Sequence, residues 1–223
     1  FDGTNGSTTI TDNSKNNVAF TVNGDSKIST AQSKFGGASL LLDGTGDYLS
    51  SPSVNDFAFG TGDFTIECWI YSSDVSDLAE RGFLQTSDTA GGLKTSYTTG
   101  IIIFQGTTVS GGLNGGLCVN VAGTTVGSST AVITTNTWYH LVGTISSSTH
   151  KIYVNGELYF GSFGWGGGTT MATDTLNLRI GMGYDSSGEP GNVKVGSVRI
   201  YNRALNNAEV LSNYYVQKSR FGL

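Results

Sequence analysis

The sequence is poor in the residues that most often carry catalysis. Its 223 residues include only two histidines, two cysteines, two methionines and two prolines. Charged residues make up 13% of the chain, about half of the usual ~25%. No serine lies in a nucleophile elbow, and no glycine-rich stretch carries a phosphate-loop lysine. His140 lies within an alternating apolar stretch, which favours a structural histidine over a catalytic base. We therefore expect no enzymatic activity.

Positive charge and long hydrophobic runs are also scarce. The net charge is −5, and the 12 lysines and arginines are scattered along the chain. Nucleic-acid binding needs a basic stripe that neutralises phosphates, so this function is excluded. The longest apolar run, GIIIFQG at 100–106, has the length of a strand and falls far short of the ~18 residues of a membrane span. We therefore expect no membrane insertion.

Glycine is abundant, and apolar residues alternate. The chain has 33 glycines, with 37% hydrophobic and 11% aromatic residues, which is typical of many short strands joined by tight turns. Residues 64–71 and 136–146 alternate with period two, and Asn155-Gly156 predicts a hairpin within 151–160. Apolar residues occur on both faces of the central strands, which predicts an all-β, two-sheet antiparallel β-sandwich. Further strands are expected at 18–22, 38–42, 82–87, 100–105, 117–122, 176–181 and 193–202.

One segment near the C-terminus has a different period. Ala208, Leu211, Tyr214 and Tyr215 recur at helical spacing, and a capping box of Asn206 with the glutamate three residues later predicts the start of one short C-terminal helix. No glycine-rich loop is long enough to be an interdomain linker, so residues 1–223 are expected to form a single domain.

The two cysteines leave two possibilities open. Cys68 and Cys118 both lie within apolar alternation. This placement suits buried free thiols, which we prefer, but it also permits one disulfide.

The stretch DGTGD at 43–47 contains two carboxylates and two glycines, as a metal-binding loop can. An EF-hand loop starting at Asp43 requires glycine at its sixth position and glutamate at its twelfth. These positions hold Tyr48 and Val54. The tetrapeptide GTGD recurs at 60–63, again just before an apolar strand. We therefore interpret both stretches as turns, with glycines at positive φ and aspartates that bond the backbone two residues on.

Several stretches together resemble the concanavalin A-like jelly-roll superfamily, in its laminin-G-like branch. The resemblance rests on KFGGASLLLDGTGDYLS (34–50), GTGDFTIECWIY (60–71), NTWYHLVGTIS (136–146), KIYVNGELY (151–159), LRIG (178–181) and VGSVRIYNRALNNAEV (195–210). It implies a concanavalin A-like jelly roll. The opening FDGTNGSTTITDNSKNN resembles the start of such domains in phage tail and other virion proteins.

The resemblance implies a broad range of functions. The fold hosts lectins, glycan-binding modules, adhesion domains and some glycoside hydrolases and lyases, so function must be argued from the site. Glycosidases of this fold carry an E-x-D-x-x-E pattern on one strand, which supplies paired carboxylates. None of the glutamates here has an acidic residue two or five positions later. The resemblance therefore favours binding over hydrolysis.

Structural calcium is a further implication of the resemblance. Relatives hold the ion with an aspartate of the last strand, but Gly196 occupies that position when VR-Y is aligned with Val198, Arg199 and Tyr201. Asp2 and Asp12 are weak candidate ligands, since calcium sites usually contain more carboxylates than two.

Three sets of residues are candidates for ligand binding. Sugars need an aromatic platform and a few fixed polar groups. The sets are Phe163 with Trp165, Tyr184 with Asp185, and Glu67 with Trp69 and Tyr71. The alternative for Trp165, which we prefer, is that it folds back and plugs one end of the sandwich. The third set lies on whichever face of its strand is not the core.

Taken together, the sequence favours a non-catalytic recognition or attachment module. Its expected partner is a glycan or a cell-surface molecule, and its expected location is a virion or an extracellular surface. The first alternative is a structural decoration or cementing domain that binds neighbouring protein subunits, and a homo-oligomer is one form of it. A glycan-active hydrolase or lyase is the third alternative.

Overall fold

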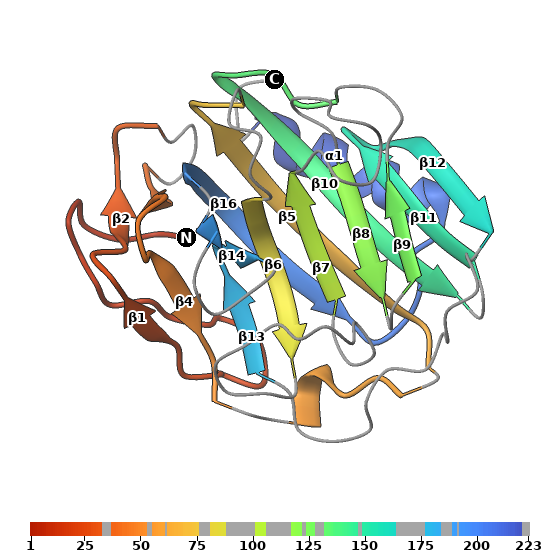
Figure 1. The fold of residues 1–223 in the computed structure, drawn as a ribbon, viewed down its shortest axis with the longest axis horizontal. Coiled ribbons are helices and arrows are strands. Elements are labelled where there is room, and N and C mark those ends of the chain that lie inside the picture. The colour runs from red at the N-terminus through yellow and green to blue at the C-terminus, as the bar shows by residue number, and fades with distance from the viewer. Residues whose placement is uncertain are drawn as a thin grey trace.

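The chain forms two stacked sheets, as the alternating apolar residues predict. The computed structural model describes residues 1–32, 37–52, 55–60, 62–75, 81–87, 101–105, 117–121, 124–127, 132–146, 149–163, 177–183, 189–190 and 192–219. Within them, the chain is a concanavalin A-like β-sandwich with one C-terminal helix, whose strands pair almost entirely antiparallel. Figure 1 shows one sheet in front of the other, with the helix behind both.

The front sheet, sheet A, contains nine strands. Its order is β1 (Thr21–Asn23), β4 (Tyr48–Ser50), β13 (Asn177–Ile180), β6 (Arg81–Ser87), β7 (Ile101–Gln105), β8 (Leu117–Val121) and β9 (Thr124–Gly127). Two short strands, β14 (Met182–Gly183) and β15 (Glu189–Pro190), pair with each other beside β6.

The rear sheet, sheet B, contains seven strands. Its order is β12 (Glu157–Phe163), β11 (Thr149–Val154), β10 (Thr137–Ser146), β5 (Phe64–Ser72), β16 (Asn192–Tyr201), β3 (Ser39–Asp43) and β2 (Lys27–Ser29). A single 3-10 turn, η1, covers Asn55–Phe57. The short strands β2, β9, β14 and β15 were not predicted, because two to four residues are too few to display a period.

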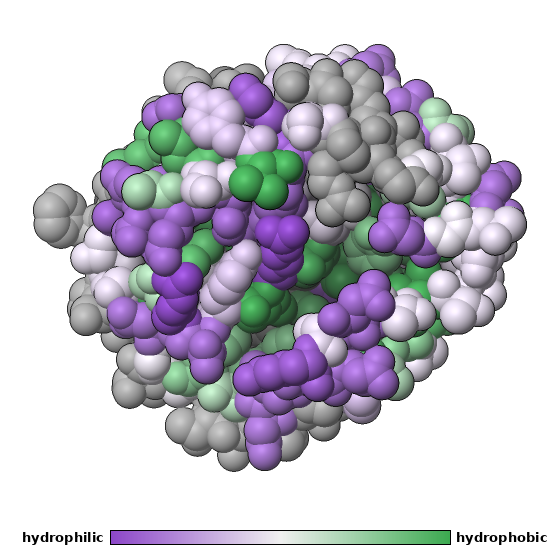
Figure 2. Space-filling view, turned by 180° about the vertical axis from the view of Figure 1, so that it is seen from behind, coloured by the Kyte–Doolittle hydropathy of each residue, from purple (hydrophilic) through white to green (hydrophobic). Residues whose placement is uncertain are grey.

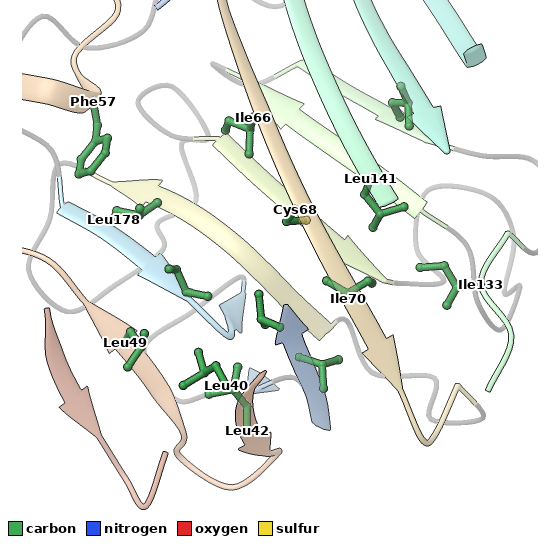
Figure 3. Close-up of a cluster of buried hydrophobic side chains, with 14 of the residues drawn as sticks. Leu40, Leu42, Leu49, Phe57, Ile66, Cys68, Ile70, Ile133, Leu141 and Leu178 are labelled. Carbon is green, nitrogen blue, oxygen red and sulfur yellow. The ribbon is translucent and has the colours of Figure 1, made fainter. Parts of the chain in front are cut away.

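The main core lies between the two sheets. In β5, Phe64, Ile66, Cys68 and Ile70 share one face, as their alternation predicts, and this face points into the core. Figure 3 shows Ile66, Cys68 and Ile70 gathered with leucines from other strands between the layers. Cys68 is a free buried thiol, so the disulfide alternative is wrong.

The first of the two predicted turns, DGTGD, adopts the predicted conformation. In DGTGD, which joins β3 to β4, Gly44 and Gly46 have φ of 87° and 75°. The carboxylate of Asp43 accepts a hydrogen bond from the N–H of Thr45 at 2.7 Å, which is the bond expected of an aspartate-initiated turn. The stretch is therefore a turn between strands, as predicted.

The outer face of sheet B is covered by helix α1 (Asn207–Lys218). The predicted capping box is confirmed: the side chain of Asn206 accepts from the N–H of Glu209 at 3.0 Å, and Glu209 accepts from the N–H of Asn206 at 2.9 Å. Of the residues at helical spacing, Leu211 and Tyr214 pack against the sheet side, beside Gly156 and Trp69. Val210 and Gln217 are buried, whereas Ala208 and Tyr215 are exposed.

The turn between β11 and β12 lies directly against α1. Asn155 and Gly156 both have positive φ, 52° and 85°, as the Asn-Gly hairpin predicts. A Cβ atom on Gly156 would lie 2.9 Å from Cβ of Tyr214 and 3.0 Å from Leu211. Glycine is therefore required here both by the backbone conformation and by the close approach of the helix.

We predict that Gly156→Ala destabilises the protein by about 2 kcal/mol or more, because it adds a clash with α1 to the cost of a left-handed residue. Gly6→Ala is the matched control: Gly6 has φ of 83°, and nothing lies within 4 Å of its added Cβ. The control is expected to cost about 1 kcal/mol. Urea unfolding of both variants measures the difference, and equal losses would contradict the packing of the hairpin against α1.

Candidate functional site

A buried carboxylate lies at the centre of the interface between sheet B and α1. Glu67, on the outward face of β5, is 1% exposed. Two residues of α1 donate hydrogen bonds to it, Asn213 at 2.7 Å and Gln217 at 2.6 Å. From β16, Tyr201 donates at 3.1 Å and Arg199 at 3.4 Å. The carboxylate therefore joins the helix to two neighbouring strands.

The environment of Glu67 keeps it ionised. Burial by itself raises the pKa of this carboxyl, but the neighbouring His140, Gln217 and Arg199 outweigh burial and lower the pKa from 4.5 to about 2. His140, on β10, is completely buried, with its Nε2 atom 3.3 Å from Oε1 of Glu67. A buried charge is stable only when it is well supplied with donors, and this requirement is met here.

An aromatic stack extends the same interface. The ring of Trp69 lies 5.0 Å from that of His140 and 5.8 Å from that of Tyr214 of α1, measured between ring centroids. Tyr71 and Trp138 pack beside this stack, with Lys194 over the ring of Tyr71 at 5.0 Å. Stacked rings add to the stability gained from burial, so α1 is held by both apolar and charged contacts.

A groove of about 370 Å³ opens beside this interface, where the end of β16 meets the first turns of α1. Its lining comes from one continuous stretch of chain: Tyr201, Arg203, Leu205, Asn206, Ala208, Glu209, Ser212 and Asn213. The size falls within the ~300–1,000 Å³ of ordinary small-ligand sites. Figure 2, viewed from the α1 side, shows a largely hydrophilic surface with hollows in which hydrophobic side chains are visible.

The walls of the groove are held by internal hydrogen bonds. The hydroxyl of Thr65 donates to the carbonyl of Arg203 at 2.9 Å and accepts from the N–H of Leu205 at 2.9 Å. On the helix side, Arg203 also donates to Glu209, at 2.9 Å. The loop between β16 and α1 is therefore held in place at both ends.

Comparison with protein families identifies the fold family. Residues 43–211 match the model described as the concanavalin A-like lectin/glucanases superfamily. The chain belongs to this superfamily. No curated protein sequence matches it. Among the described residues, no helix has both the length and the apolar character needed to cross a bilayer.

Several solved structures of binding domains resemble this chain in fold. The receptor-binding domain of botulinum neurotoxin D matches with a TM-score of 0.67 and 15% identity over 96% of this chain and 51% of that chain. The serotype D ligand-binding domain in complex with N-acetylneuraminic acid matches at 0.65 and 14%, over 96% and 49% of the two chains. The binding domain of Paraclostridial mosquitocidal protein 1 matches at 0.64 and 16%, over 92% and 49%. The chain spans about half the length of these proteins.

The structure describes the three predicted sets of ligand-binding residues to different extents. Glu67, Trp69 and Tyr71 lie together on the non-core face of β5, but α1 and its neighbours cover them, with exposures of 1%, 0% and 7%. This face is therefore a packing face for the helix, which corrects the expectation that a ligand in solvent contacts it. Phe163 is described only in its backbone, as the last residue of β12. Trp165, Tyr184 and Asp185 lie outside the described residues.

Of the candidate calcium ligands, Asp12 is engaged in a local turn. Its carboxylate accepts from the N–H and hydroxyl of Ser14 at 2.9 and 2.7 Å, and from the N–H of Val18 at 2.8 Å. Asp2 is exposed. Calcium binding stays a prediction.

An acidic cluster that the sequence did not predict lies at the DGTGD turn. Carboxylate oxygens of Asp25, Asp43 and Asp47 lie within 4.8 Å of one another. Asp47 is buried, which raises its pKa, and it accepts from the N–H groups of Asp25 at 2.7 Å and Asp43 at 3.1 Å. The buried carboxylate thus ties the turn to the loop before β2.

The groove was not predicted from the sequence either, because the predicted ligand sites were aromatic residues, mainly in glycine-rich loops, and its lining at 201–213 is not such a loop. One signal was available. Glu67 is a lone carboxylate in an otherwise apolar strand, and Asn213 and Gln217 share a helix face at a spacing of four. Such a pairing of polar residues indicates a buried hydrogen-bond network, and with it the position of the helix that forms one wall of the groove.

We predict that Glu67→Gln destabilises the fold by about 3 kcal/mol at neutral pH, because it removes the charge that four donors and His140 surround. Since folding lowers the pKa of Glu67 from 4.5 to about 2, its contribution is complete above pH 4.5 and is lost as the pH falls toward 2. The stability difference between wild type and variant should therefore narrow over this pH range.

Urea unfolding at several pH values measures this difference. Glu157→Gln, a change at an exposed carboxylate of the β11–β12 hairpin, is the control and should alter stability little. A gap between wild type and Glu67→Gln that stays constant from pH 6 to 2 would show that the charge of Glu67 does not stabilise the fold.

Proposed function

We propose that this chain is a non-catalytic recognition or attachment module. Its partner is a glycan or a cell-surface molecule, and it works as part of a virion or extracellular assembly. The proposal rests first on membership of a lectin and glucanase superfamily. It is supported by the fold neighbours, whose names describe receptor-binding domains, and by one neighbour in complex with N-acetylneuraminic acid.

The observation that carries the non-catalytic part of the proposal is the state of Glu67. It is the only glutamate on β5, one of the central strands of sheet B, and its side chain is 1% exposed. A general acid needs a raised pKa, but the pKa of Glu67 is lowered to about 2. A nucleophile needs access to substrate, which α1 blocks. Glu67 is therefore suited to hold the helix and unsuited to either role in glycoside hydrolysis.

A structural role that binds neighbouring protein subunits is the second candidate. The observation that favours it is a set of exposed apolar side chains on β12 and α1. Leu158 and Tyr159 are 45% and 38% exposed, and Tyr215 and Val216 are 53% and 70% exposed. Elements β12 and α1 lie in contact. Exposed apolar groups of this kind are common at protein interfaces, so subunit contacts would use this side of the molecule.

Binding and cleavage assays on the purified chain test the proposal. We expect binding to immobilised glycans or intact cells and no release of reducing ends from a polysaccharide panel. Cleavage that disappears in Glu67→Gln, with the variant still folded, would overturn the non-catalytic assignment. Absence of binding to glycans and cells, together with self-association that Val216→Asp abolishes, would favour the structural role.

A further inference from the structure

We propose that the groove between the end of β16 and α1 binds a neutral saccharide. This inference rests on the proposed recognition function and assigns a site and a ligand class to it. The groove is formed by described residues on the helix-covered side of sheet B.

The polar groups of the groove match the hydroxyl groups of a sugar. A hydroxyl both donates and accepts, so a sugar site needs both kinds of partner. Arg203 supplies N–H donors, and Glu209 supplies carboxylate acceptors. The amide nitrogen of Asn213 is used by Glu67, which leaves the amide oxygen as an acceptor. Exposed Ser212 adds a hydroxyl. Neighbouring hydroxyls of one ring can thus be bound by several side chains at once.

The charges of the groove favour a neutral ligand. Among the described residues that line it, Arg203 and Glu209 are the charged ones, and they form an ion pair at 2.9 Å. An anionic ligand that approached Arg203 would also approach the carboxylate of Glu209, and a cationic ligand would meet the opposite problem. Because the pair is exposed, with side-chain exposures of 55% and 36%, it can share its hydrogen bonds with hydroxyls at little cost.

An apolar part of the lining suits the other surface of a sugar. Half-buried Tyr201 contributes a ring and exposed Ala208 a methyl group, while Leu205, 4% exposed, belongs to the core cluster behind the lining. Sugar rings present C–H groups on their faces, which pack against such surfaces. The groove therefore combines an apolar patch with polar groups of both kinds.

The groove is rigid enough to bind without rearranging. Tyr201 of β16 and Asn213 of α1 both line it, and both donate to Oε2 of Glu67, at 3.1 and 2.7 Å. They are also bonded to each other at 3.2 Å. The backbone around Arg203 and Leu205 is fixed by Thr65. Preorganised walls of this kind reduce the entropy lost on binding.

Ser212→Trp tests the site by filling the groove, since Ser212 is an exposed helix position that takes no part in the Glu67 network. Ser219→Trp, at the exposed C-cap outside the groove, is the matched control. Arg203→Met removes the guanidinium donors but keeps the apolar stem. The probe is an array of neutral and carboxylate-bearing oligosaccharides, followed by titration calorimetry with the best neutral binder.

We expect a neutral oligosaccharide to bind wild type and Ser219→Trp equally. Binding should disappear in Ser212→Trp and weaken about tenfold or more in Arg203→Met. Thermal melting and circular dichroism establish that each variant is folded. If Ser212→Trp misfolds, the test rests on Arg203→Met. An affinity of Arg203→Met for the neutral oligosaccharide equal to that of wild type then overturns the proposal.

The other outcomes separate this inference from the proposed function. Equal affinity in Ser212→Trp and wild type overturns the groove as the site but leaves glycan recognition intact. Binding of acidic oligosaccharides alone overturns the ligand class. No binding to any oligosaccharide, with cell binding retained, overturns this inference while the recognition function stands. No binding to oligosaccharides or cells overturns both.

Discussion

The ionised carboxylate of Glu67 under helix α1 is the interaction on which the helix-covered side of the molecule depends. A buried carboxylate without hydrogen-bond donors or a positive charge nearby would destabilise the fold strongly. It is stable because β10, β16 and α1 each bring polar groups to it, including Gln217 at 2.6 Å and Asn213 at 2.7 Å. These donors come from elements far apart in the chain, so satisfying one charge fixes how the helix lies on the sheet.

The position of the helix in turn determines the available surface. With α1 docked, Trp69 and Glu67 are inaccessible, and the groove lined by described residues lies beside the helix. Tyr201 and Asn213 connect the two regions, because each contacts Glu67 and also lines the groove. The buried charge and the surface groove are therefore one structural unit, in which the charge orders the walls that a ligand would meet.

Much of the fold could be predicted from the sequence, because period-two alternation directly reports which residues of a strand share a face. The grouping of Phe64, Ile66, Cys68 and Ile70 on one face of β5 and the capping box of α1 follow from local patterns alone, whereas the structure shows which face of β5 is inward. The docking face of α1 follows only in part. Apolar spacing selected Tyr214, which packs against Trp69, but also Ala208 and Tyr215, which are exposed, and it missed the buried Gln217. A buried glutamine appears solvent-facing in any hydrophobicity pattern, and only its distant partner, Glu67, explains its position.

The buried carboxylates of Asp47 and Glu67 have the same kind of role. Asp47 ends a turn by accepting two backbone N–H groups, and Glu67 positions a helix by accepting side-chain donors. Both acids are buried and act as acceptors within the fold, so neither is left to act on a substrate. In contrast, Arg203 and Glu209 form an ion pair at the surface. Replacing this exposed interaction by hydrogen bonds to water or to a ligand costs little free energy. Within the described residues, buried carboxylates thus build the scaffold, and the exposed ion pair of Arg203 and Glu209 is what the proposed saccharide site would use.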